Sequence, residues 1–540
     1  MASPSLLKGI GTVGFFTLGS RITGFLRDML QAALLGAGDT AAAFIVAFRI
    51  PNLFRSLFAE GAFSAGFVPI FASLHEGDGH AKAMAFAREA ASVLVLVLAT
   101  FSALMIVFMP WVVRLIAPGF VDDPGLMASA VELSRIAFPY LFFISLTSLQ
   151  SGILNALHIF AAPAAAPILL NLTVIGFLLG STVLDTHRAE AMAWGVSAAG
   201  LIQFLWLGYH CWRAGAALKI GRPRLSPDVK MLLTRMLPVA IGAGVYQLNM
   251  FVSTSIATLV SASAVSWLYY ADRVNQLPVG IVGVAVGIVL LPLLSRQIRA
   301  GNEEAALANQ NRAIEFSLLL TVPASVGIAV LAEPITATLF ERGAFTPEDR
   351  EAVAAALLAF SFALPAYVLN KALTPGFFGR HDTVTPVKSA GAAFIVNVVA
   401  SLALIQGYGH LGIALASSLS AWMNAVTLYV ILHRRGHIKP DARLKKRVPR
   451  LILAAAAMGA AVWAALHFAL DLLGPVFGPP NAAAASEMMR VYTLAPVIAV
   501  GGLVFLASAF LFGAADKNDF KQFRRAQGSQ GPGSNTPGGA

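Results

Sequence analysis

Charged residues interrupt both of the apolar stretches that open this chain. They include four arginines and two carboxylates: Arg21, Arg27, Asp28, Arg49, Arg55 and Glu60. An arginine at the centre of a bilayer costs about 2.5–3.5 kcal/mol on insertion scales, so four of them facing lipid would cost about 10–14 kcal/mol. A water-filled cavity between helices removes most of this cost. We therefore expect these side chains to line such a cavity, and a cationic cavity at membrane depth favours an anionic cargo.

The composition is that of a polytopic membrane protein. Of the 540 residues, 57% are hydrophobic and 12% are charged, whereas soluble domains average about 25% charged residues. Apolar segments of about 20 residues, the length that crosses a bilayer as an α-helix, recur along most of the chain. We expect an all-α fold of about fourteen transmembrane helices, at roughly 6–36, 41–74, 86–116, 128–157, 165–185, 190–212, 232–262, 264–297, 312–336, 350–377, 386–406, 409–433, 449–472 and 490–513.

The net charge of +11 arises mostly from short loops, so it indicates orientation rather than nucleic-acid binding. The loops after even-numbered helices hold most of the lysines and arginines, and the richest is residues 433–450. The positive-inside rule then places both termini in the cytoplasm. We expect the first helix to be retained rather than cleaved as a signal peptide. The Gly/Ser/Pro-rich end of the chain is expected to be a disordered cytoplasmic tail.

A weak internal repeat divides the helices into two halves. Arg49 precedes Pro69, and Arg273 precedes Pro292, at similar spacing in the second and eighth helices. Two copies of six helices would be parallel repeats, related by an axis along the membrane normal. We therefore predict an N-terminal lobe (1–225), a C-terminal lobe (226–435), two additional helices (436–515) and the tail (516–540).

The spacing of the polar residues places several of them on shared helix faces. Arg49, Asn52 and Arg55 follow at i, i+3 and i+6, which keeps them on one broad face. Arg21 and Arg27 lie about 120° apart around a helix, so one rim of a cavity accommodates both. Arginine suits phosphate because its planar guanidinium donates two parallel hydrogen bonds and stays charged. A diphosphate, or a group with several carboxylates, is the expected cargo.

The second half offers Arg273 as a further cargo-binding residue. Its neighbour Asp272 points about 100° away on a helix, so the two are expected to have separate partners. Glu60 is a candidate partner of Arg21 or Arg55. The alternative is a closed set of internal salt bridges without any ligand.

The sequence favours a transporter over an enzyme. It has no P-loop lysine motif, no HExxH, no GxSxG and no Cys/His metal spacing, and Cys211 is the only cysteine. No cofactor is expected. Four further charged residues are expected to be structural or interfacial: Glu132, Arg135, Glu315 and Lys371.

Five segments carry a resemblance to a known family. They are SRITGFLRDMLQAALLGAG (20–38), AFRIPNLFRSLFAEGAFSAGFVPIF (47–71), SWLYYADRVNQLPVGIVGVAVG (266–287), LLPLLS (290–295) and TPGFFGRHDTVTPVK (374–388). These segments resemble the bacterial lipid II flippases, the MurJ or MviN family, of the multidrug/oligosaccharidyl-lipid/polysaccharide exporter superfamily. The resemblance covers about residues 6–515. It implies a MATE-like fold of two six-helix lobes with two additional C-terminal helices.

The resemblance also implies a function in peptidoglycan synthesis. The family moves undecaprenyl-diphosphate-linked peptidoglycan precursor from the inner to the outer leaflet of the bacterial inner membrane. Its required basic residues match Arg21, Arg27, Arg55 and Arg273, and its acidic positions match Asp28 and Glu60. The two additional helices correspond to a pair that forms a groove for the polyprenyl tail.

The chain departs from the family pattern at one position. Where the family has an aspartate after GAG, this chain has Ala42, and Asp39 lies three residues earlier. We expect Asp39 to supply the missing charge. Some relatives use a sodium site. Ser253 and Asn397 lie near the place expected for that site, but the coupling ion stays unassigned. The membrane potential or a monovalent cation is the expected source of coupling.

Three alternative interpretations remain open from the sequence. The first is an exporter of drugs or of another lipid-linked oligosaccharide from the same superfamily. The second is a membrane enzyme acting on polyprenyl phosphates, and the third is a scaffold without transport. Under the flippase interpretation, the expected partners are lipid II, membrane lipids and proteins of cell-wall synthesis or division, and the protein is expected to be a monomer.

Overall fold

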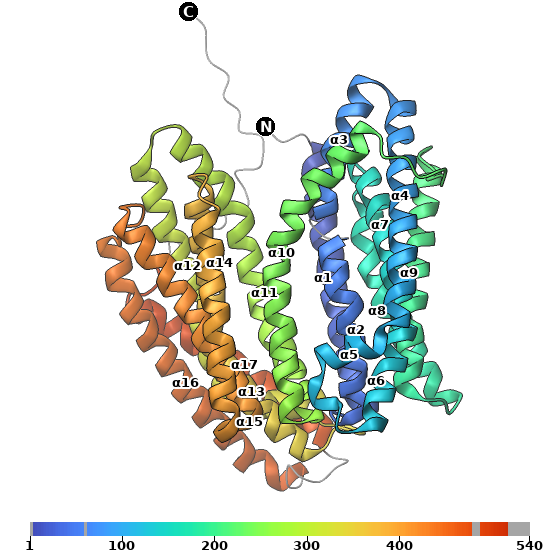
Figure 1. Cartoon of the computed structure of the whole chain (residues 1–540). Coiled ribbons are helices and arrows are strands. Elements are labelled where there is room, and N and C mark those ends of the chain that lie inside the picture. Colours follow the sequence, from blue (N-terminus) through green and yellow to red (C-terminus); the bar gives the residue numbers. More distant parts are fainter. Residues whose placement is uncertain (1–3, 59–61, 478–485, 517–540) are drawn as a thin grey trace, which may run out of the picture. The chain divides into compact units, whose positions relative to one another are not determined.

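The computed structural model describes residues 4–58, 62–477 and 486–516, and every regular element in these ranges is a helix (Figure 1). The predicted all-α class is therefore confirmed. The N-terminal helices are α1 (Pro4–Leu35), α2 (Asp39–Phe58), α3 (Ala62–Gly77), α4 (His80–Val107), α5 (Met109–Ile116), the 3₁₀ turn η1 (Pro118–Phe120), α6 (Pro124–Ala137), α7 (Pro139–Ala156), α8 (Ala161–Val183) and α9 (Arg188–Arg213). The remaining helices are α10 (Pro227–Val260), α11 (Ala262–Arg299), α12 (Glu303–Phe340), α13 (Pro347–Ser361), α14 (Leu364–Phe378), α15 (Val384–Arg434), α16 (Ala442–Phe477) and α17 (Ser486–Leu511).

Helix starts follow ordinary capping chemistry. Pro124, Pro139 and Pro227 lie in the first turn of α6, α7 and α10, where a missing backbone N–H has no cost. Asp123 caps α6, because its Oδ1 accepts hydrogen bonds from the backbone N–H of Gly125 at 2.9 Å and of Leu126 at 3.0 Å.

Each of the fourteen expected ranges is mostly helix where the structure describes it, and short turns, such as those at Phe108, Phe138 and 184–185, interrupt or end several of them. Four ranges comprise two helices each: α2 with α3, α4 with α5, α6 with α7, and α13 with α14. The reverse occurs in α15, where non-helical backbone at Gly409 (φ 53°, ψ −132°) separates the ranges expected at 386–406 and 409–433. In the described part of the chain, nine helical stretches are long and apolar enough to cross a membrane. The full number of fourteen membrane crossings stays a prediction.

The chain forms two compact units. Among the described residues, the first unit takes in Met1–Arg273, Leu339–Ala356 and Phe394–Ala416, and the second takes in Val274–Thr338, Leu357–Ala393 and Ser417–Ala540. Thus α11, α12, α13 and α15 each contribute to both units. The predicted boundaries of the lobes and of the additional helices stay predictions.

Stacked phenylalanines build part of the core of the first unit. Phe67 stacks on Phe63, Phe71 and Phe86, with ring centroids 5.1–5.6 Å apart. These rings come from α3 and α4 and are buried against residues of α7 and α10. Stacked aromatic pairs add about 0.5–1.5 kcal/mol each beyond the burial of their area.

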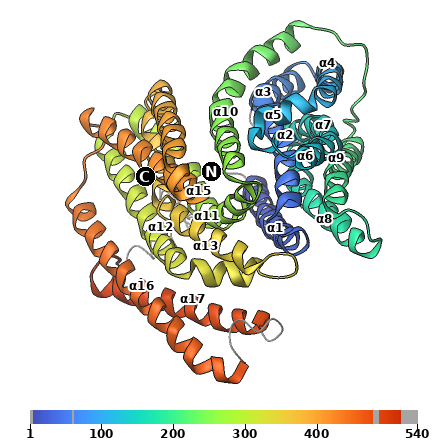
Figure 2. The same ribbon diagram turned by 60° about the horizontal axis from the view of Figure 1, so that its bottom comes forward.

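In the second unit, α12, α16 and α17 share one apolar core. Leu331 of α12 packs with Met458 of α16 and with Leu494 and Phe505 of α17. The helices α16 and α17 lie side by side along their length (Figure 2). These are the two additional helices expected from the sequence.

Candidate functional site

A buried carboxylate lies at the centre of a polar cluster in the first unit. Asp28, on α1, is 2% exposed. Its Oδ1 lies 2.7 Å from Nη2 of Arg27 and accepts a hydrogen bond from the hydroxyl of Tyr269 at 3.0 Å. Its Oδ2 lies 3.3 Å from Nε of Arg273. Asp28 therefore links α1 to α11, a contact between residues far apart in the sequence.

Arg27 is fixed from three directions. Besides its pair with Asp28, Nη1 donates to Oδ1 of Asn171 on α8 at 3.1 Å. Its guanidinium also lies 5.7 Å from the ring centre of Phe48 on α2. The Arg27 side chain is 9% exposed. These contacts hold Arg27 in one orientation, so it positions Asp28 within the cluster.

Arg273 is held more loosely than Arg27. Its guanidinium lies 4.7 Å from the ring centre of Tyr269, which precedes it by one helical turn. Its side chain is 31% exposed. Two guanidinium groups thus share the Asp28 carboxylate, and that of Arg273 is the more accessible of them.

The predicted polar face of α2 lies against α10. Nε of Arg55 donates to Oδ1 of Asn52 at 2.7 Å, as the i, i+3 spacing led us to expect. One turn further back on the same face, Nη1 of Arg49 donates to the backbone carbonyl of Met250 at 3.4 Å. All three side chains of this face are partly buried.

Two of the remaining predicted site residues, Arg21 and Asp39, lie apart from the Asp28 contacts. Arg21 is exposed on α1, seven residues before Asp28, which corresponds to about 10 Å along the helix. Asp39 is exposed at the start of α2, whereas Ala42 is fully buried, so these two positions have different surroundings. Glu60 lies outside the described residues. The roles assigned to all nine predicted residues in cargo binding stay predictions.

Two site residues were not foreseen, although the sequence holds a signal for each. Tyr269 precedes Arg273 at i−4 in YYADR, the spacing of side chains that meet on a helix. Asn171 is a lone amide in the apolar run PILLNLTV. A polar group buried at such a place needs a hydrogen-bond partner, and Asn171 meets this need by bonding Arg27, the hydroxyl of Thr23 and the carbonyl of Ser20.

A backbone contact closes the end of α1 against the loop after α12. The N–H of Ala344 donates to the carbonyl of Ala33 at 2.8 Å. Gly36 and Gly343 flank this contact with φ of 69° and 60°, a region that side chains disfavour. A Cβ at Gly343 would lie 2.2 Å from the Ala33 oxygen, and one at Gly36 would lie 2.5 Å from the Ala344 oxygen. We call this hydrogen bond between Ala344 and Ala33 the latch. Glycine is therefore required on both sides of it.

The residues near the expected sodium site bond to one another. Nδ2 of Asn397 donates to Oδ1 of Asn249 at 2.8 Å and to Oγ of Ser253 at 3.1 Å. In the described ranges, no three His, Cys, Asp or Glu side chains are grouped as they would be in a metal site. A coupling cation stays unassigned.

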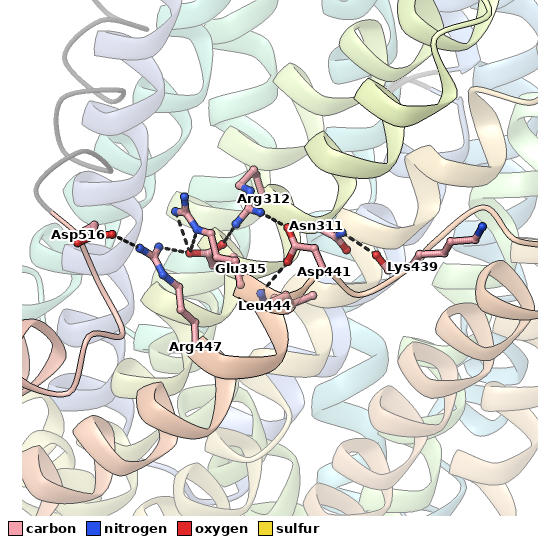
Figure 3. Close-up of polar contacts among 9 residues, drawn as sticks. Asn311, Arg312, Glu315, Lys439, Asp441, Leu444, Arg447 and Asp516 are labelled. Carbon is pink, nitrogen blue, oxygen red and sulfur yellow. Dashed lines mark hydrogen bonds and ion pairs between the residues drawn. The ribbon is translucent and has the colours of Figure 1, made fainter.

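A second charged cluster lies in the second unit and joins three elements (Figure 3). Glu315 of α12 accepts from Arg312 of its own helix and from Arg443 and Arg447 of α16. Arg312 also pairs with Asp441, just before α16, and Arg447 pairs with Asp516, after α17, at 3.0 Å.

Arginines and carboxylates are equal in number among the members of the Glu315 cluster (Arg312, Glu315, Asp441, Arg443, Arg447 and Asp516). The cluster therefore joins α12 to the two C-terminal helices and offers no excess charge for a ligand. This agrees with the structural role expected for Glu315.

Comparison with known proteins shows the family to which this chain belongs. The family described as Lipid II flippase MurJ matches residues 31–484. The chain belongs to the lipid II flippase MurJ family. A protein of Rhizobium meliloti named probable lipid II flippase MurJ is 44% identical over 515 residues, covering 95% of each chain. The lipid II flippase MurJ of Burkholderia cenocepacia is 36% identical over 472 residues, covering 86% of this chain and 91% of that one.

Solved structures support the fold of the family. A lipid II flippase MurJ in an inward closed conformation aligns with a TM-score of 0.74 at 23% identity, over 93% of this chain and 98% of the other. A multidrug resistance MATE family transporter of the MOP superfamily, in an inward-facing conformation, aligns with a TM-score of 0.65 at 14% identity. The alignment covers 77% of this chain and 94% of the other. The fold is therefore MATE-like, as predicted. Members of the family are flippases of bacterial inner membranes, so this chain is a multi-pass transporter and not an enzyme.

Proposed function

We propose that this protein moves lipid II from the cytoplasmic to the periplasmic leaflet by alternating access between its lobes. Membership of the lipid II flippase MurJ family supports the cargo. The observation that carries the mechanism is the pair of guanidinium groups on Asp28, because two positive charges share one carboxylate. A charged head group cannot cross hydrocarbon unaided, and an arginine-lined passage between helices provides the alternative route.

The predicted site residues take different parts in this proposal. Arg273, whose side chain is 31% exposed, contacts the diphosphate, and the exposed Arg21 provides a second cation on α1. Arg27 positions Asp28, because the Arg27 side chain is held on three sides. The polar face of α2, with Arg49, Asn52 and Arg55, contacts the remainder of the head group.

The predicted topology places the latch between Ala33 and Ala344 on the periplasmic side of the first unit. Both segments follow odd-numbered helices of the predicted topology, and the positive-inside rule places these loops outside and both termini in the cytoplasm. The membrane potential favours export, since each negative charge moved outward gains about 2.3 kcal/mol per 100 mV. The polyprenyl tail stays in lipid, against α16 and α17, and the transporter acts as a monomer.

The test depletes the protein in living cells and adds a probe that cleaves only lipid II in the outer leaflet. Cleavage is expected to fall on depletion and to return with the wild-type gene. Continued cleavage at the normal level, with no other flippase present, contradicts the proposal. A fall in export of another lipid-linked oligosaccharide, with lipid II unaffected, would favour the alternative cargo.

A further inference from the structure

Two adjacent tyrosines of α11 contact the α1 segment at two different places. Tyr269 donates its hydroxyl to Oδ1 of Asp28 at 3.0 Å, in the polar cluster around Asp28. Tyr270 donates its hydroxyl to the backbone carbonyl of Gly36 at 3.0 Å, just after the end of α1. The two tyrosines are 8% and 0% exposed, and all four residues belong to the first unit. One turn of α11 therefore contacts both the candidate ligand site and the surroundings of the latch.

The end of α1 depends on hydrogen-bond donors from other elements, because the last carbonyls of a helix have no partner within it. The carbonyl of Ala33 accepts the latch hydrogen bond. The carbonyl of Leu34 accepts from Nη1 of Arg188 at 2.9 Å. Gly36 is buried, so loss of the Tyr270 hydroxyl would leave its carbonyl without this donor. Tyr270 thus helps to hold the end of α1 where the latch needs it.

Tyr270 also packs against the segment that carries the other half of the latch. Its ring centre lies 5.2 Å from that of Phe340 and 5.8 Å from that of Phe345. Phe345 is 3% exposed and directly follows Ala344, whose N–H forms the latch. A displacement of Tyr270 therefore acts on both sides of the latch, through Gly36 on one side and through Phe345 on the other.

Tyr269 is held by the charges for which an anionic ligand would compete. Its ring centre lies 4.7 Å from the guanidinium of Arg273, and its hydroxyl bonds to the carboxylate with which Arg273 pairs. A cation near a ring and a hydrogen bond to a charged group both depend on where the charges lie. An anion that draws Arg273 away from Asp28 therefore changes the forces on Tyr269. Tyr270 moves with Tyr269, because neighbouring residues of an α-helix are joined by the same backbone hydrogen bonds.

We propose that Tyr269 and Tyr270 are positioning residues that couple the binding of an anionic head group at Arg273 to the opening of the latch. This inference rests on the proposed function, since it takes the diphosphate of lipid II as the anion. Without ligand, the charges around Asp28 hold Tyr269, and Tyr270 holds Gly36. When the diphosphate draws Arg273 away, this turn of α11 shifts, Tyr270 leaves Gly36, and the latch opens. Neither tyrosine needs to touch the cargo.

Hydrogen exchange follows the latch directly. The full-length protein in lipid nanodiscs is placed in D₂O with or without lipid II, and mass spectrometry measures deuterium uptake in the peptide that contains Ala344. Exchange of the Ala344 N–H reports how often the latch opens. Lipid II is expected to speed this exchange in the wild type by roughly fivefold or more, which is the lower end of ordinary coupling between two sites.

The two tyrosines are expected to respond differently when each loses only its hydroxyl. In Tyr269→Phe, lipid II should still bind but should no longer speed the exchange, because the link to Asp28 is missing. In Tyr270→Phe, the exchange should be roughly two- to tenfold faster even without lipid II, which corresponds to the loss of one hydrogen bond. The matched control is Tyr140→Phe, which removes the hydroxyl of another buried tyrosine of the first unit, on α7, and should behave as the wild type.

Two results in the variants would overturn the proposal. If the tyrosines only stabilise the fold, both variants lower Tm and keep the full response of the exchange rate to lipid II. If Tyr269→Phe fails to bind lipid II, Tyr269 is a cargo-binding residue and not a positioning residue.

The wild type separates a failure of this coupling from a failure of the proposed function. Lipid II that binds without changing the exchange rate contradicts the coupling and leaves the flippase assignment intact. A wild-type protein that does not bind lipid II contradicts both.

A comparison without ligand tests the same link. Arg273→Ala imitates the departure of Arg273 toward a ligand, so it is expected to speed the exchange when Tyr269 is present and to have little effect in the Tyr269→Phe background. Equal acceleration in both backgrounds would contradict the coupling.

Discussion

Nε of Arg273, on α11, lies 3.3 Å from Oδ2 of Asp28, on α1. Oδ1 of the same carboxylate pairs with Arg27 at 2.7 Å. One buried carboxylate therefore compensates two guanidinium groups contributed by different helices. The two guanidinium groups differ in exposure, because the Arg27 side chain is 9% exposed and that of Arg273 is 31% exposed.

Removing the charge of Asp28 is expected to destabilise the protein. In Asp28→Asn, Arg27 and Arg273 lose their shared carboxylate while Arg27 stays buried, and breaking a buried pair costs about 3–5 kcal/mol. The measurement is Tm of the purified protein by intrinsic fluorescence. Asp122→Asn, at an exposed loop position, is the control and should leave Tm unchanged. An Asp28→Asn variant with the wild-type Tm would show that the carboxylate is not needed for folding.

Replacing Arg273 is expected to abolish transport with little effect on folding. Arg273→Ala removes a partly exposed guanidinium, and a hydrogen-bonded charge contributes about 1.5–3 kcal/mol, or roughly 10–150-fold in affinity. Arg21→Ala and Arg55→Ala are expected to behave in the same way. The measurement is complementation of a depletion strain, with protein in the membrane fraction quantified by immunoblot. Full complementation by the triple alanine variant would exclude these arginines from cargo binding.

A side chain at position 343 is expected to open the latch. Gly343→Ala places a Cβ 2.2 Å from the Ala33 oxygen and also disfavours φ of 60°. Gly301→Ala is the matched control, because Gly301 has φ of 72° but open space around its Cβ position.

Cysteine labelling measures this opening. Cys211 is the only cysteine in the chain, so Ala344→Cys in a Cys211→Ser background gives a single reporter. A membrane-impermeant maleimide added to intact cells is expected to label it several-fold faster in Gly343→Ala than in Gly301→Ala. Equal labelling rates would argue against a latch at this contact.

The Glu315 cluster is expected to hold the C-terminal helices in place. Glu315→Gln leaves three arginines without their shared partner, and Arg447 is 7% exposed. We expect the free energy of unfolding to fall by about 3 kcal/mol. This is the lower end of the range for breaking a buried ion pair, because Arg312 and Arg443 are about one-third exposed. The measurement is Tm together with the rate of proteolysis in the loop before α16. The exposed Glu304→Gln is the control, and equal behaviour of the two variants would contradict the prediction.

An ion pair outside the membrane-spanning segments predicts a defined pH dependence. Asp382 accepts hydrogen bonds from Oγ1 and N–H of Thr385, at 2.6 and 2.9 Å, and from Nη1 of Arg435 at 2.6 Å. The Thr385 hydrogen bonds, followed by Arg435, hold the pKa of the Asp382 carboxyl well below its usual value. A lowered folded-state pKa stabilises the protein above the unfolded pKa of about 3.9, and this stabilisation is lost as pH falls through the folded value.

The Asp382→Asn variant tests this direction of the pH dependence of stability. It should lower stability by no more than about 1 kcal/mol at pH 7, because the pair is partly exposed to solvent. The difference in Tm from the wild type should stay constant between pH 7 and pH 5 and shrink below about pH 4. A difference that grows on acidification would contradict the assignment.

The sequence by itself determined the elements of the protein and its family. Apolar length located the helices, because a bilayer requires about 20 apolar residues per crossing. Helical spacing predicted the shared face of Asn52 and Arg55, since residues three apart meet on any α-helix. The motifs around Arg21, Arg49 and Arg273 identified the family, which the comparisons with known proteins confirmed.

Only the tertiary structure decided which of these residues meet. Arg27 and Arg273 share Asp28, and Asn171 supports Arg27 from α8, whereas Arg21 lies outside these contacts. Spacing along one helix fixes neighbours within that helix alone. Contacts between α1, α8 and α11 depend on how side chains pack across helices, and that packing depends on the three-dimensional fold rather than on any local pattern.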